Sequence, residues 1–445
     1  MHLRPRLLAA GLALAAAAPA GLRAAAGDAA PLPDPLDLPG AVRFALDHNF
    51  AIRQARERIR QQEGIEIQVR ARQIPSVAAS GSYTGNAREI SSFVPAQSNS
   101  WTIALQARQV LFAGGGVSAA VAGERLAREA ATFELEGVIN QQLLAVRTQF
   151  YAVLLARERV AVQEENVKLQ QQQLKDAQSR FDAGTTSNFD LLTAQVALAN
   201  GQPPLIQARN DYRIALEQLR QALGAPAGSQ EAAPAALAGS LEIARPEEYQ
   251  LNDALSSAAA NRPELLQLAR LQSAGEQNVR ASRAGYFPEL DLVGGYVWTR
   301  NPFSASFSDR LEGWTAGVQA QWNLFDGRAT AGRVRQARSQ LEQAKLTLAE
   351  ATLAVQVQVR QAYSSFVEAR ELVDASGKTV EQAQEALRIA NVRYRTGTAT
   401  QLDVLTSQVA LTQARLNQLQ ALYGYHVALA SLRQAIGQAD EFVRS

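Results

Sequence analysis

The sequence predicts an α+β membrane protein in which one structural unit occurs twice. A glycine-centred stretch occurs as RFDAGTTSNFDLLTAQVAL from Arg180 and again as RYRTGTATQLDVLTSQVAL from Arg393, 213 residues later. Two long segments without proline carry apolar residues at the 3-or-4 spacing of coiled coils. Four short segments alternate apolar and polar residues as half-buried strands do. Each unit should therefore contain a helix, two strands, a long helix and a returning helix.

The composition excludes several classes of protein. The 445 residues carry a net charge of only +2 and no dense Lys/Arg block, which argues against a nucleic-acid partner. There is no cysteine, so disulfides, thiolate metal sites and cysteine nucleophiles are excluded. The three histidines lie far apart in the sequence. We therefore expect no metal site and no cofactor.

The N-terminus predicts export. Residues 1–26 form a signal peptide, with Arg4 and Arg6 before a short alanine-rich apolar core and a cleavage site near Ala26. The alternative is an N-terminal membrane anchor, but the apolar run is short for one. No later stretch approaches the roughly 20 apolar residues of a membrane-spanning helix.

The duplication organises nearly the whole mature chain. Between residues 180–224 and 393–437, 20 of 45 positions are identical without a gap. Such a long match predicts one unit written twice. The expected divisions are a first repeat over 27–224, an Ala/Pro/Gly-rich equatorial linker over 225–248, a second repeat over 249–437 and a tail over 438–445.

The helices should differ in length by a factor of about two. Residues 118–181 and 329–394 predict long helices, which at 1.5 Å per residue extend about 95 Å. The helices expected before the strands, over 38–73 and 249–285, have roughly 35 residues, as do the returning helices. Stacked end to end, one helix of each short kind would cover one long helix.

The returning helix of the first unit contains two prolines that the second unit lacks. Gly201, Pro203 and Pro204 stand where the second unit has Ala414, Leu416 and Asn417. Proline removes a hydrogen bond from a helix interior and bends it. We therefore expect a bend or brief unwinding near Gly201 in the first unit only, at the level of the linker.

The strand segments predict an outer-membrane barrel. They begin near residues 77, 101, 290 and 314, and the last one places apolar residues at every second position: Trp314, Ala316, Val318, Ala320, Trp322 and Leu324. Lipid-facing and lumen-facing residues alternate in this way. Tryptophans near the strand ends, namely Trp101, Trp298, Trp314 and Trp322, are typical of aromatic girdles. A soluble sheet buried on one face is the alternative.

Four strands cannot close a barrel, and an open sheet edge is not tolerated in hydrocarbon. The chain must then borrow strands from copies of itself. Three copies give twelve strands and leave a lumen, whereas the interior of an eight-stranded barrel is largely filled by side chains. The predicted assembly is a homotrimer with a twelve-strand outer-membrane barrel, joined to a cylinder of long coiled-coil helices.

The order of elements, the repeated Arg-aromatic-x-x-Gly-Thr tip and the LF-x-G sequence after a strand resemble the TolC family of outer-membrane channel proteins. The resemblance covers essentially the whole mature chain. It implies a passive exit duct in the outer membrane of a Gram-negative bacterium, in contact with outer-membrane lipid, with a periplasmic α-helical coiled-coil tunnel. It also implies two partners, an inner-membrane transporter of RND or ABC type and a periplasmic adaptor that docks at the helical tips.

The resemblance assigns roles to residues of both tips. Asp403 matches an aspartate at the tunnel entrance, where three copies would form a carboxylate ring, and Asp190 is its equivalent in the first unit. Thr406 stands where the family's fullest version has a second acid, so a weaker cation preference follows. The alternative for both aspartates is a charge that favours the start of the returning helix. Adaptor docking is assigned to Arg180, Gly184, Thr185, Arg393, Gly397 and Thr398, although the glycines can simply turn the chain.

Three functions remain open at this point. Export of small molecules (drugs, toxic compounds or metal ions) is favoured, with type I protein secretion as the alternative within the same architecture. A periplasmic coiled-coil scaffold without a pore is the alternative of a different class. An enzyme is disfavoured, because the glycine-rich stretch FAGGGVSAAV lacks the lysine and the surrounding elements of a phosphate-binding loop.

Overall fold

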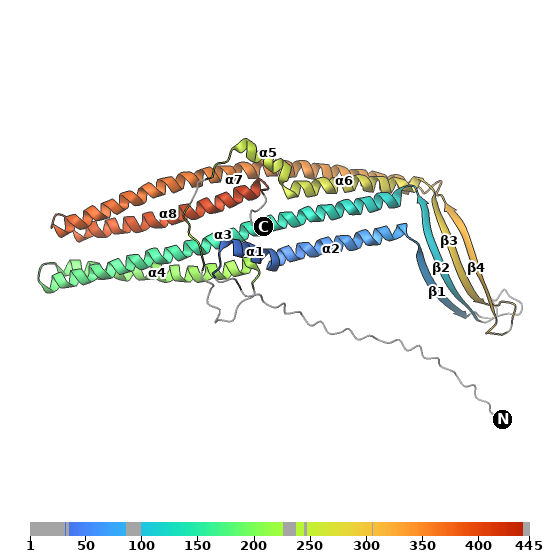
Figure 1. Cartoon of the computed structure of the whole chain (residues 1–445), viewed down its shortest axis with the longest axis horizontal. Coiled ribbons are helices and arrows are strands. Elements are labelled where there is room, and N and C mark those ends of the chain that lie inside the picture. The colour runs from blue at the N-terminus through green and yellow to red at the C-terminus, as the bar shows by residue number, and fades with distance from the viewer. Residues whose placement is uncertain are drawn as a thin grey trace, which may run out of the picture.

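The computed structural model describes residues 32, 35–85, 99–225, 237–243, 247–304 and 306–438. The predicted signal peptide, the loop between the first two strands, about half of the linker and most of the tail lie outside these residues. The molecule is elongated, with a four-stranded sheet at one end and two helical hairpins at the other (Figure 1).

The long helices are confirmed and slightly exceed the prediction. α3 (Gly116–Asp182) and α7 (Ala329–Arg395) each have 67 residues, which corresponds to about 100 Å. The returning helices α4 (Asn188–Leu223) and α8 (Gln401–Ala435) have 36 and 35 residues. Each returning helix packs along the half of its long helix that is remote from the sheet (Figure 1).

The prediction of one continuous helix before each strand pair is wrong. Each segment is divided in two, giving α1 (Leu38–His48), α2 (Phe50–Arg70), α5 (Leu251–Asn261) and α6 (Pro263–Arg283). At the first break Asn49 has extended backbone, and its side chain accepts hydrogen bonds from the amides of Ala51 and Ile52. At the second, Arg262 is extended because it precedes Pro263, which disfavours helical backbone in the residue before it.

Each long helix is covered by two shorter helices placed end to end, as predicted. α2 and α4 both pack on α3, and α6 and α8 both pack on α7. The end of α4 reaches the break between α1 and α2, where Gly224 lies against the backbone of His48. The end of α8 reaches the second break, where Gly437 lies against the backbone of Asn261. The two units thus repeat the same junction.

Of the bend or unwinding predicted at the proline pair, the unwinding is wrong, and so is its predicted level. α4 is one unbroken helix that includes Pro203 and Pro204, so there is no unwinding. Packing along α3 holds the segment, and Gly201 gives room to the side chain of Gln170 from α3. The prolines also lie about 20 residues from Gly224 at the end of α4, roughly 30 Å away, and so not at the level of the linker.

The sheet is antiparallel, in the order β1-β2-β3-β4. Its strands are β1 (Ser76–Gly85), β2 (Asn99–Ala113), β3 (Glu289–Arg300) and β4 (Arg310–Gln321). The expected continuation of β4 to Leu324 is wrong, since the strand ends at Gln321. The central strand β2 is longer and carries an irregularity between Val110 and Phe112.

The register places all the alternating apolar residues on one face. Cross-strand partners share a face of a sheet, and the partners Tyr83–Trp101, Ile103–Trp298 and Tyr296–Trp314 connect all four strands. The opposite face carries mainly Ser, Thr, Gln and Gly, with a few apolar and charged side chains. β1 and β4 are the edges of the sheet. Among the described helices, none combines the length and apolarity needed to cross a bilayer.

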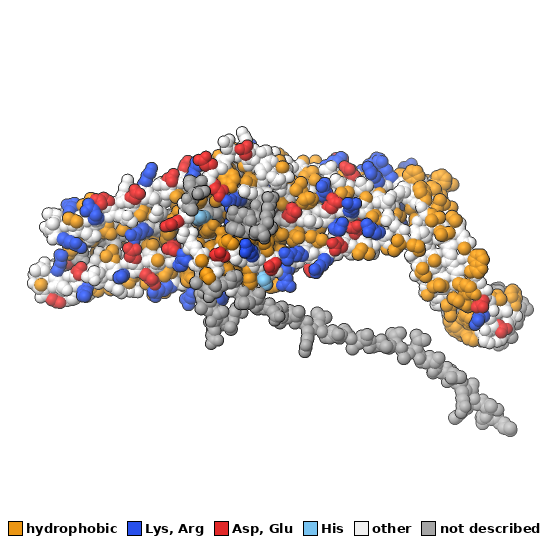
Figure 2. Space-filling model, in the orientation of Figure 1, with side chains coloured by type: hydrophobic (Ala, Val, Ile, Leu, Met, Phe, Trp, Pro, Cys, Tyr) orange, Lys and Arg blue, Asp and Glu red, His pale blue; other side chains and the backbone are white. Residues whose placement is uncertain are grey.

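The main hydrophobic cores lie around the two junctions. One joins Phe150 of α3 to Leu219 and Leu223 of α4. The other joins Phe366 of α7 to Tyr425 of α8 and their neighbours. Figure 2 shows charged side chains scattered along the helices, while over the visible face of the sheet they are confined mainly to its far end. The middle of the molecule therefore holds its two largest packed cores, and both ends extend from it.

Candidate functional site

The first helical tip is a glycine turn closed by its own threonine. Gly184 has φ +68° and ends α3. The amide of Thr185 donates to the carbonyl oxygen of Arg180 at 2.9 Å, and its hydroxyl donates to the same oxygen at 3.0 Å. Gly184 N donates to the Phe181 carbonyl at 2.9 Å, which completes a Schellman motif. The turn explains the adjacent glycine and threonine, whereas it uses only the backbone carbonyl of Arg180.

The second tip repeats this turn but uses its arginine differently. Gly397 has φ +74°, and the Thr398 amide donates to the Arg393 carbonyl oxygen at 2.8 Å. The guanidinium of Arg393 donates back to the Thr398 carbonyl at 3.2 Å. In contrast, the guanidinium of Arg180 lies 4.8 Å from the ring centre of Tyr394 at the other tip. Arg393 closes its own turn, whereas Arg180 links the two tips.

Asp190 caps the helix that leaves the first tip. Its Oδ2 accepts hydrogen bonds from the hydroxyls of Ser187 and Thr186, both at 2.8 Å, and the Ser187 hydroxyl accepts from the Asp190 amide. This is a capping box. The Ser187 and Thr186 hydroxyls hold the pKa of the Asp190 carboxyl below its usual range. The carboxylate therefore serves the start of α4, whatever else it does.

Asp403 caps the second returning helix with fewer donors. Its Oδ2 accepts from the Thr400 amide and hydroxyl, both at 2.8 Å. Ala399 replaces the threonine that adds a further hydroxyl in the first tip. Hydrogen bonds from Thr400, with a contribution from the charge of Arg393, hold the pKa of the Asp403 carboxyl below its usual range. Asp403 is exposed, and Asp190 is half-buried.

An exposed apolar residue, which was not among the predicted site residues, lies beside each of these aspartates. Phe189 is 77% exposed and its equivalent Leu402 is 66% exposed. Each is followed on its helix by a further exposed apolar side chain, Val196 on α4 and Val409 on α8. The signal was present in the sequence, because an apolar residue directly precedes the aspartate in both copies. The tips thus combine cationic, polar and apolar groups.

The four tryptophans lie at two levels of the sheet. One lies just beyond β4, at the end nearest the helices, where Trp322 Nε1 donates to the Tyr286 carbonyl at 3.1 Å. The others lie toward the far end: Trp101, Trp298 and Trp314. Trp101 Nε1 donates to the Phe307 carbonyl at 3.2 Å, and Trp314 is 76% exposed. Tryptophan side chains thus lie near both ends of the strands.

The polar face of the sheet carries an ion-pair network that the sequence did not reveal. Arg108 of β2 lies 2.5 Å from the carboxylate of Asp291 and 3.5 Å from that of Glu289, both on β3. Farther along the same face, the hydroxyls of Thr102 and Thr299 are 3.0 Å apart. These partners are far apart in the sequence, so only the register of β2 against β3 brings them together.

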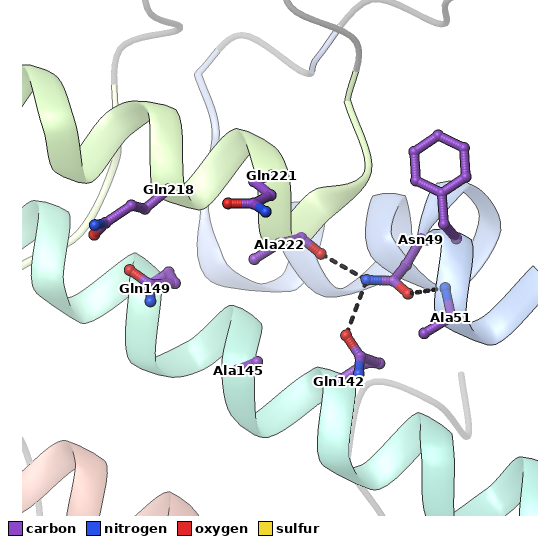
Figure 3. A pocket seen from close by; sticks show the side chains of 9 residues that line it. Asn49, Ala51, Gln142, Ala145, Gln149, Gln218, Gln221 and Ala222 are labelled. Carbon is purple, nitrogen blue, oxygen red and sulfur yellow. Dashed lines mark hydrogen bonds between the residues drawn. The ribbon is translucent and has the colours of Figure 1, made fainter.

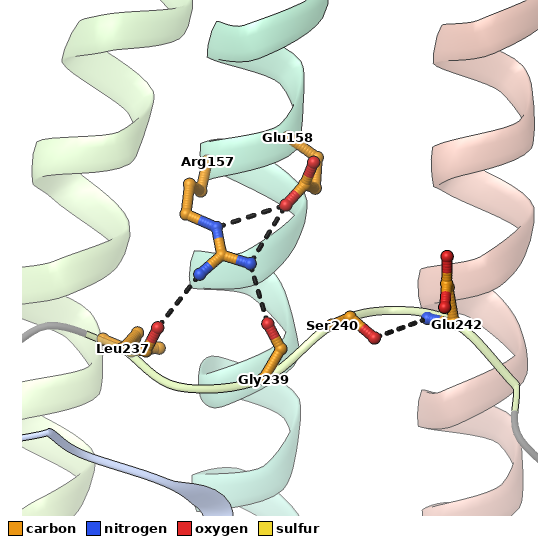
Figure 4. A network of polar contacts seen from close by, with 6 residues as sticks. All are labelled: Arg157, Glu158, Leu237, Gly239, Ser240 and Glu242. Atoms are coloured by element: carbon orange, nitrogen blue, oxygen red, sulfur yellow. Dashed lines mark hydrogen bonds and ion pairs between the residues drawn. The ribbon is translucent and has the colours of Figure 1, made fainter.

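A described part of the linker, residues 237–243, crosses the middle of the helical region. Figure 4 shows the guanidinium of Arg157 on α3, which donates to the carbonyls of Leu237 at 3.0 Å and Gly239 at 2.8 Å. His426 of α8 lies 3.0 Å from the Leu241 carbonyl. Its ring stacks on Tyr151 of α3, with centroids 4.3 Å apart. Burial lowers the pKa of His426, so the crossing is held by a neutral ring near neutral pH.

The described residues contain no group of three or more His, Asp or Glu side chains placed to hold a metal ion. The residues with candidate roles therefore fall into two groups, one at the helical tips and one on the two faces of the sheet. About 100 Å of helix separates them.

Comparisons with known proteins agree with this architecture. A family model described as outer membrane efflux protein matches residues 41–225 and 254–438. The alkaline protease secretion protein AprF of Pseudomonas aeruginosa is 26% identical over 303 residues, 68% of this chain and 63% of AprF, so the chain spans less than two thirds of that protein. Protein CyaE of Bordetella pertussis is 27% identical over 413 residues, 93% of this chain and 85% of CyaE. The crystal structure of the outer membrane protein VceC from Vibrio cholerae has a TM-score of 0.75 at 17% identity, covering 90% of this chain and 96% of that chain.

Proposed function

The chain belongs to the outer membrane efflux protein family, and from this premise we propose that its trimer is the passive exit duct of a tripartite transport system. The protein lies in the outer membrane, with its helices in the periplasm. The observation that carries the proposal is the single apolar face shared by all four strands. With that face toward lipid, the polar face lines a lumen, and three copies supply twelve strands.

The aromatic residues fit the two interfaces of the membrane. Trp101, Trp298 and Trp314 would lie at the outer level, and Trp322 would lie at the periplasmic level. Indole rings prefer the headgroup region because one end is apolar and the other is a hydrogen-bond donor. The polar network of Arg108, Asp291 and Glu289 would then face water inside the barrel rather than lipid.

The helical tips are the proposed docking site of a periplasmic adaptor, which connects the duct to an inner-membrane transporter of RND or ABC type. Arg180 and Arg393 supply charge, and Gly184, Gly397, Thr185 and Thr398 build the two turns. Phe189 and Leu402 add exposed apolar surface at the same level. Such a mixture of apolar anchors and arginine is typical of protein interfaces.

Asp403 is the proposed selectivity residue of the periplasmic entrance. It is the more exposed of the two aspartates and has fewer local donors than Asp190. A ring of three carboxylates attracts cations. Thr406 leaves this ring single, so the expected cation preference is moderate.

Conductance of the purified trimer in a planar bilayer tests the duct. We expect ion conduction, with the cation-to-anion permeability ratio lowered several-fold by Asp403→Ala and changed less by the matched variant Asp190→Ala. A trimer that inserts but does not conduct would favour the scaffold without a pore. An unchanged permeability ratio in Asp403→Ala would remove that residue from the entrance.

Small molecules are the proposed cargo, in agreement with the efflux description of the family. Protein secretion is the second candidate, because AprF is by its name a protease secretion protein. Deletion of the gene separates the two. Increased sensitivity to toxic compounds, with secreted proteins unchanged, supports efflux, whereas loss of one secreted protein without increased sensitivity supports secretion.

A further inference from the structure

The two lateral edges of the chain are unlike each other, and no described element of the same chain packs against either edge. One edge carries β1, α2 and α4, and the opposite edge carries β4 and α7, because α6 packs between α3 and α7 (Figure 1). Both helical edges expose large apolar side chains. On α4 these are Phe189, Leu192, Val196, Ile206 and Ile214, and on α7 they are Leu346, Leu353, Val357, Leu372, Ile389 and Val392.

The chain contains its own example of how two units pack side by side. α3 of the first unit runs antiparallel to α8 of the second, with which it makes many contacts. From the middle of the molecule toward the tips, the contacts between α3 and α8 are the pairs Tyr151–His426, Arg159–Gln420, Glu165–Arg415 and Gln173–Gln408. The partner numbers run in opposite directions, which fixes the register of this in-chain seam.

Near the junction where α8 ends, the in-chain seam places Leu144 of α3 beside a groove. The groove between α7 and α8 has a volume of about 620 Å³, and its lining includes Ser431 and Gln434 of α8 and Leu144 of α3. Leu144 thus comes from the other unit. In the duplication, 213 residues on, the position equivalent to Leu144 is Val357 on the open edge.

The equivalent groove in the first unit has no such neighbour within the described chain. It lies between α3, α4 and the start of α2, with a volume of about 530 Å³ (Figure 3). Gln218 and Gln221 line it at the positions that correspond to Ser431 and Gln434. Asn49 holds its end by donating to the Ala222 carbonyl at 2.8 Å. No residue of the second unit lines this groove.

We propose that Val357 of one chain packs at the groove formed by Gln218 and Gln221 of a second copy, so that α7 and the neighbouring α4 adopt the register of α3 and α8. Val357 is 52% exposed in the single chain. The proposal rests on the trimeric duct and agrees with the sheet, because the same two edges carry β4 and β1, which must pair between copies for the barrel to close.

The seam between chains should differ in chemistry from the seam within a chain. The ion pair Glu165–Arg415, with its atoms 2.7 Å apart, corresponds between chains to Lys378 and Gln202. The hydrogen bond from Arg159 to Gln420 corresponds to Leu372 and Gln207. The register thus replaces an ion pair by a lysine–glutamine pair, and a hydrogen bond from arginine by a leucine–glutamine pair. Contacts between chains should therefore depend less on salt than the contacts within each chain.

Cysteine pairs test the register, since the native chain has no cysteine. In membranes, the double variant Val357→Cys/Gln218→Cys treated with a short bismaleimide should give covalent dimers and trimers on denaturing gels. The matched pair Leu144→Cys/Ser431→Cys lines the same groove within one chain. It should migrate as a monomer whose two thiols no longer react with a maleimide label, which shows that it has cross-linked. Val357→Cys/Gln207→Cys shifts one partner by 11 residues, about 16 Å along α4, and should cross-link at most a tenth as well.

Two outcomes would overturn the register. One is a trimer in which Val357→Cys/Gln218→Cys does not cross-link although the Leu144→Cys/Ser431→Cys control does. The other is equal cross-linking by the shifted pair. Conductance measured on the same preparations separates this result from the duct itself: conducting trimers without the expected cross-link contradict only the register, whereas cross-linked trimers that do not conduct contradict only the duct.

Discussion

The helical tips and the equatorial junctions end their helices with the same motif but for different reasons. Gly184 and Gly397 at the tips and Gly224 and Gly437 at the junctions all have φ between +68° and +75°. A Cβ at either tip glycine would meet nothing within 4 Å, whereas at Gly224 it would lie 2.6 Å from the His48 carbonyl oxygen. A tip glycine is therefore needed only for its left-handed backbone. A junction glycine is also needed because a side chain would clash with neighbouring backbone.

The largest expected effect is at the junction. Gly224→Ala adds left-handed strain and a clash with backbone that cannot rotate away, together about 2–5 kcal/mol of lost stability. The apparent melting temperature of the trimer, followed by its dissociation on gels, should fall clearly. Gly437→Ala is the matched variant in the second unit, where a Cβ would lie 2.8 Å from the Asn261 carbonyl oxygen. If both variants melt like the native trimer, the close backbone contact at the junction glycines does not contribute to stability.

Alanine at a tip should cost less. Gly184→Ala and Gly397→Ala meet open space, so only the left-handed backbone is penalised, by about 1–2 kcal/mol. Asparagine tolerates this backbone better, so Gly184→Asn should recover part of the loss. Amide hydrogen exchange in the last turn of α3 reports the effect locally. A loss at the tip as large as that of Gly224→Ala would remove the distinction between the two sites.

Loss of a capping hydroxyl should come next. Ser187→Ala and Thr400→Ala remove the side chain that accepts from the amide of the capping-box aspartate, at about 0.5–2 kcal/mol each. Exchange in the first turn of α4 or α8 should accelerate accordingly. Ser407→Ala is the control for α8. The Ser407 hydroxyl lies on that helix and donates to the Asp403 carbonyl oxygen, but it does not cap the helix. Equal acceleration in the control would show that the caps contribute nothing specific.

The smallest effect is a pH dependence at the tips. The folded-state pKa values of Asp190 and Asp403 are lowered by their cap hydrogen bonds. The caps are thus fully stabilising above the unfolded-state pKa of about 3.9, and this stabilisation is lost as the pH falls through the lower folded values. First-turn exchange, corrected for its intrinsic pH dependence, should show progressive loss of protection below pH about 4. Asp190→Asn should remove that dependence from α4 while α8 retains it.

Sequence reasoning succeeded where the determinants are local. Glycine turns, proline-free heptads and strand alternation depend on residues close together in the sequence. The duplication also allowed each feature to be checked against its copy. It failed where contacts between distant segments decide. Continuous packing on α3 keeps α4 helical through Pro203, and strand register alone brings Arg108 to Asp291. Arg180 and Arg393 read alike, yet only the folded chain shows that one of them reaches Tyr394.

The open edges of the sheet constrain the order in which this protein can mature. β1 has ten residues and β4 has twelve, and in a lone chain about half of the backbone amides and carbonyls of each face outward without a partner. Each such group costs several kcal/mol in hydrocarbon. The penalty for one inserted subunit is thus on the order of tens of kcal/mol. The subunits should accordingly associate before or during membrane entry, and a single inserted chain should not accumulate as a stable intermediate.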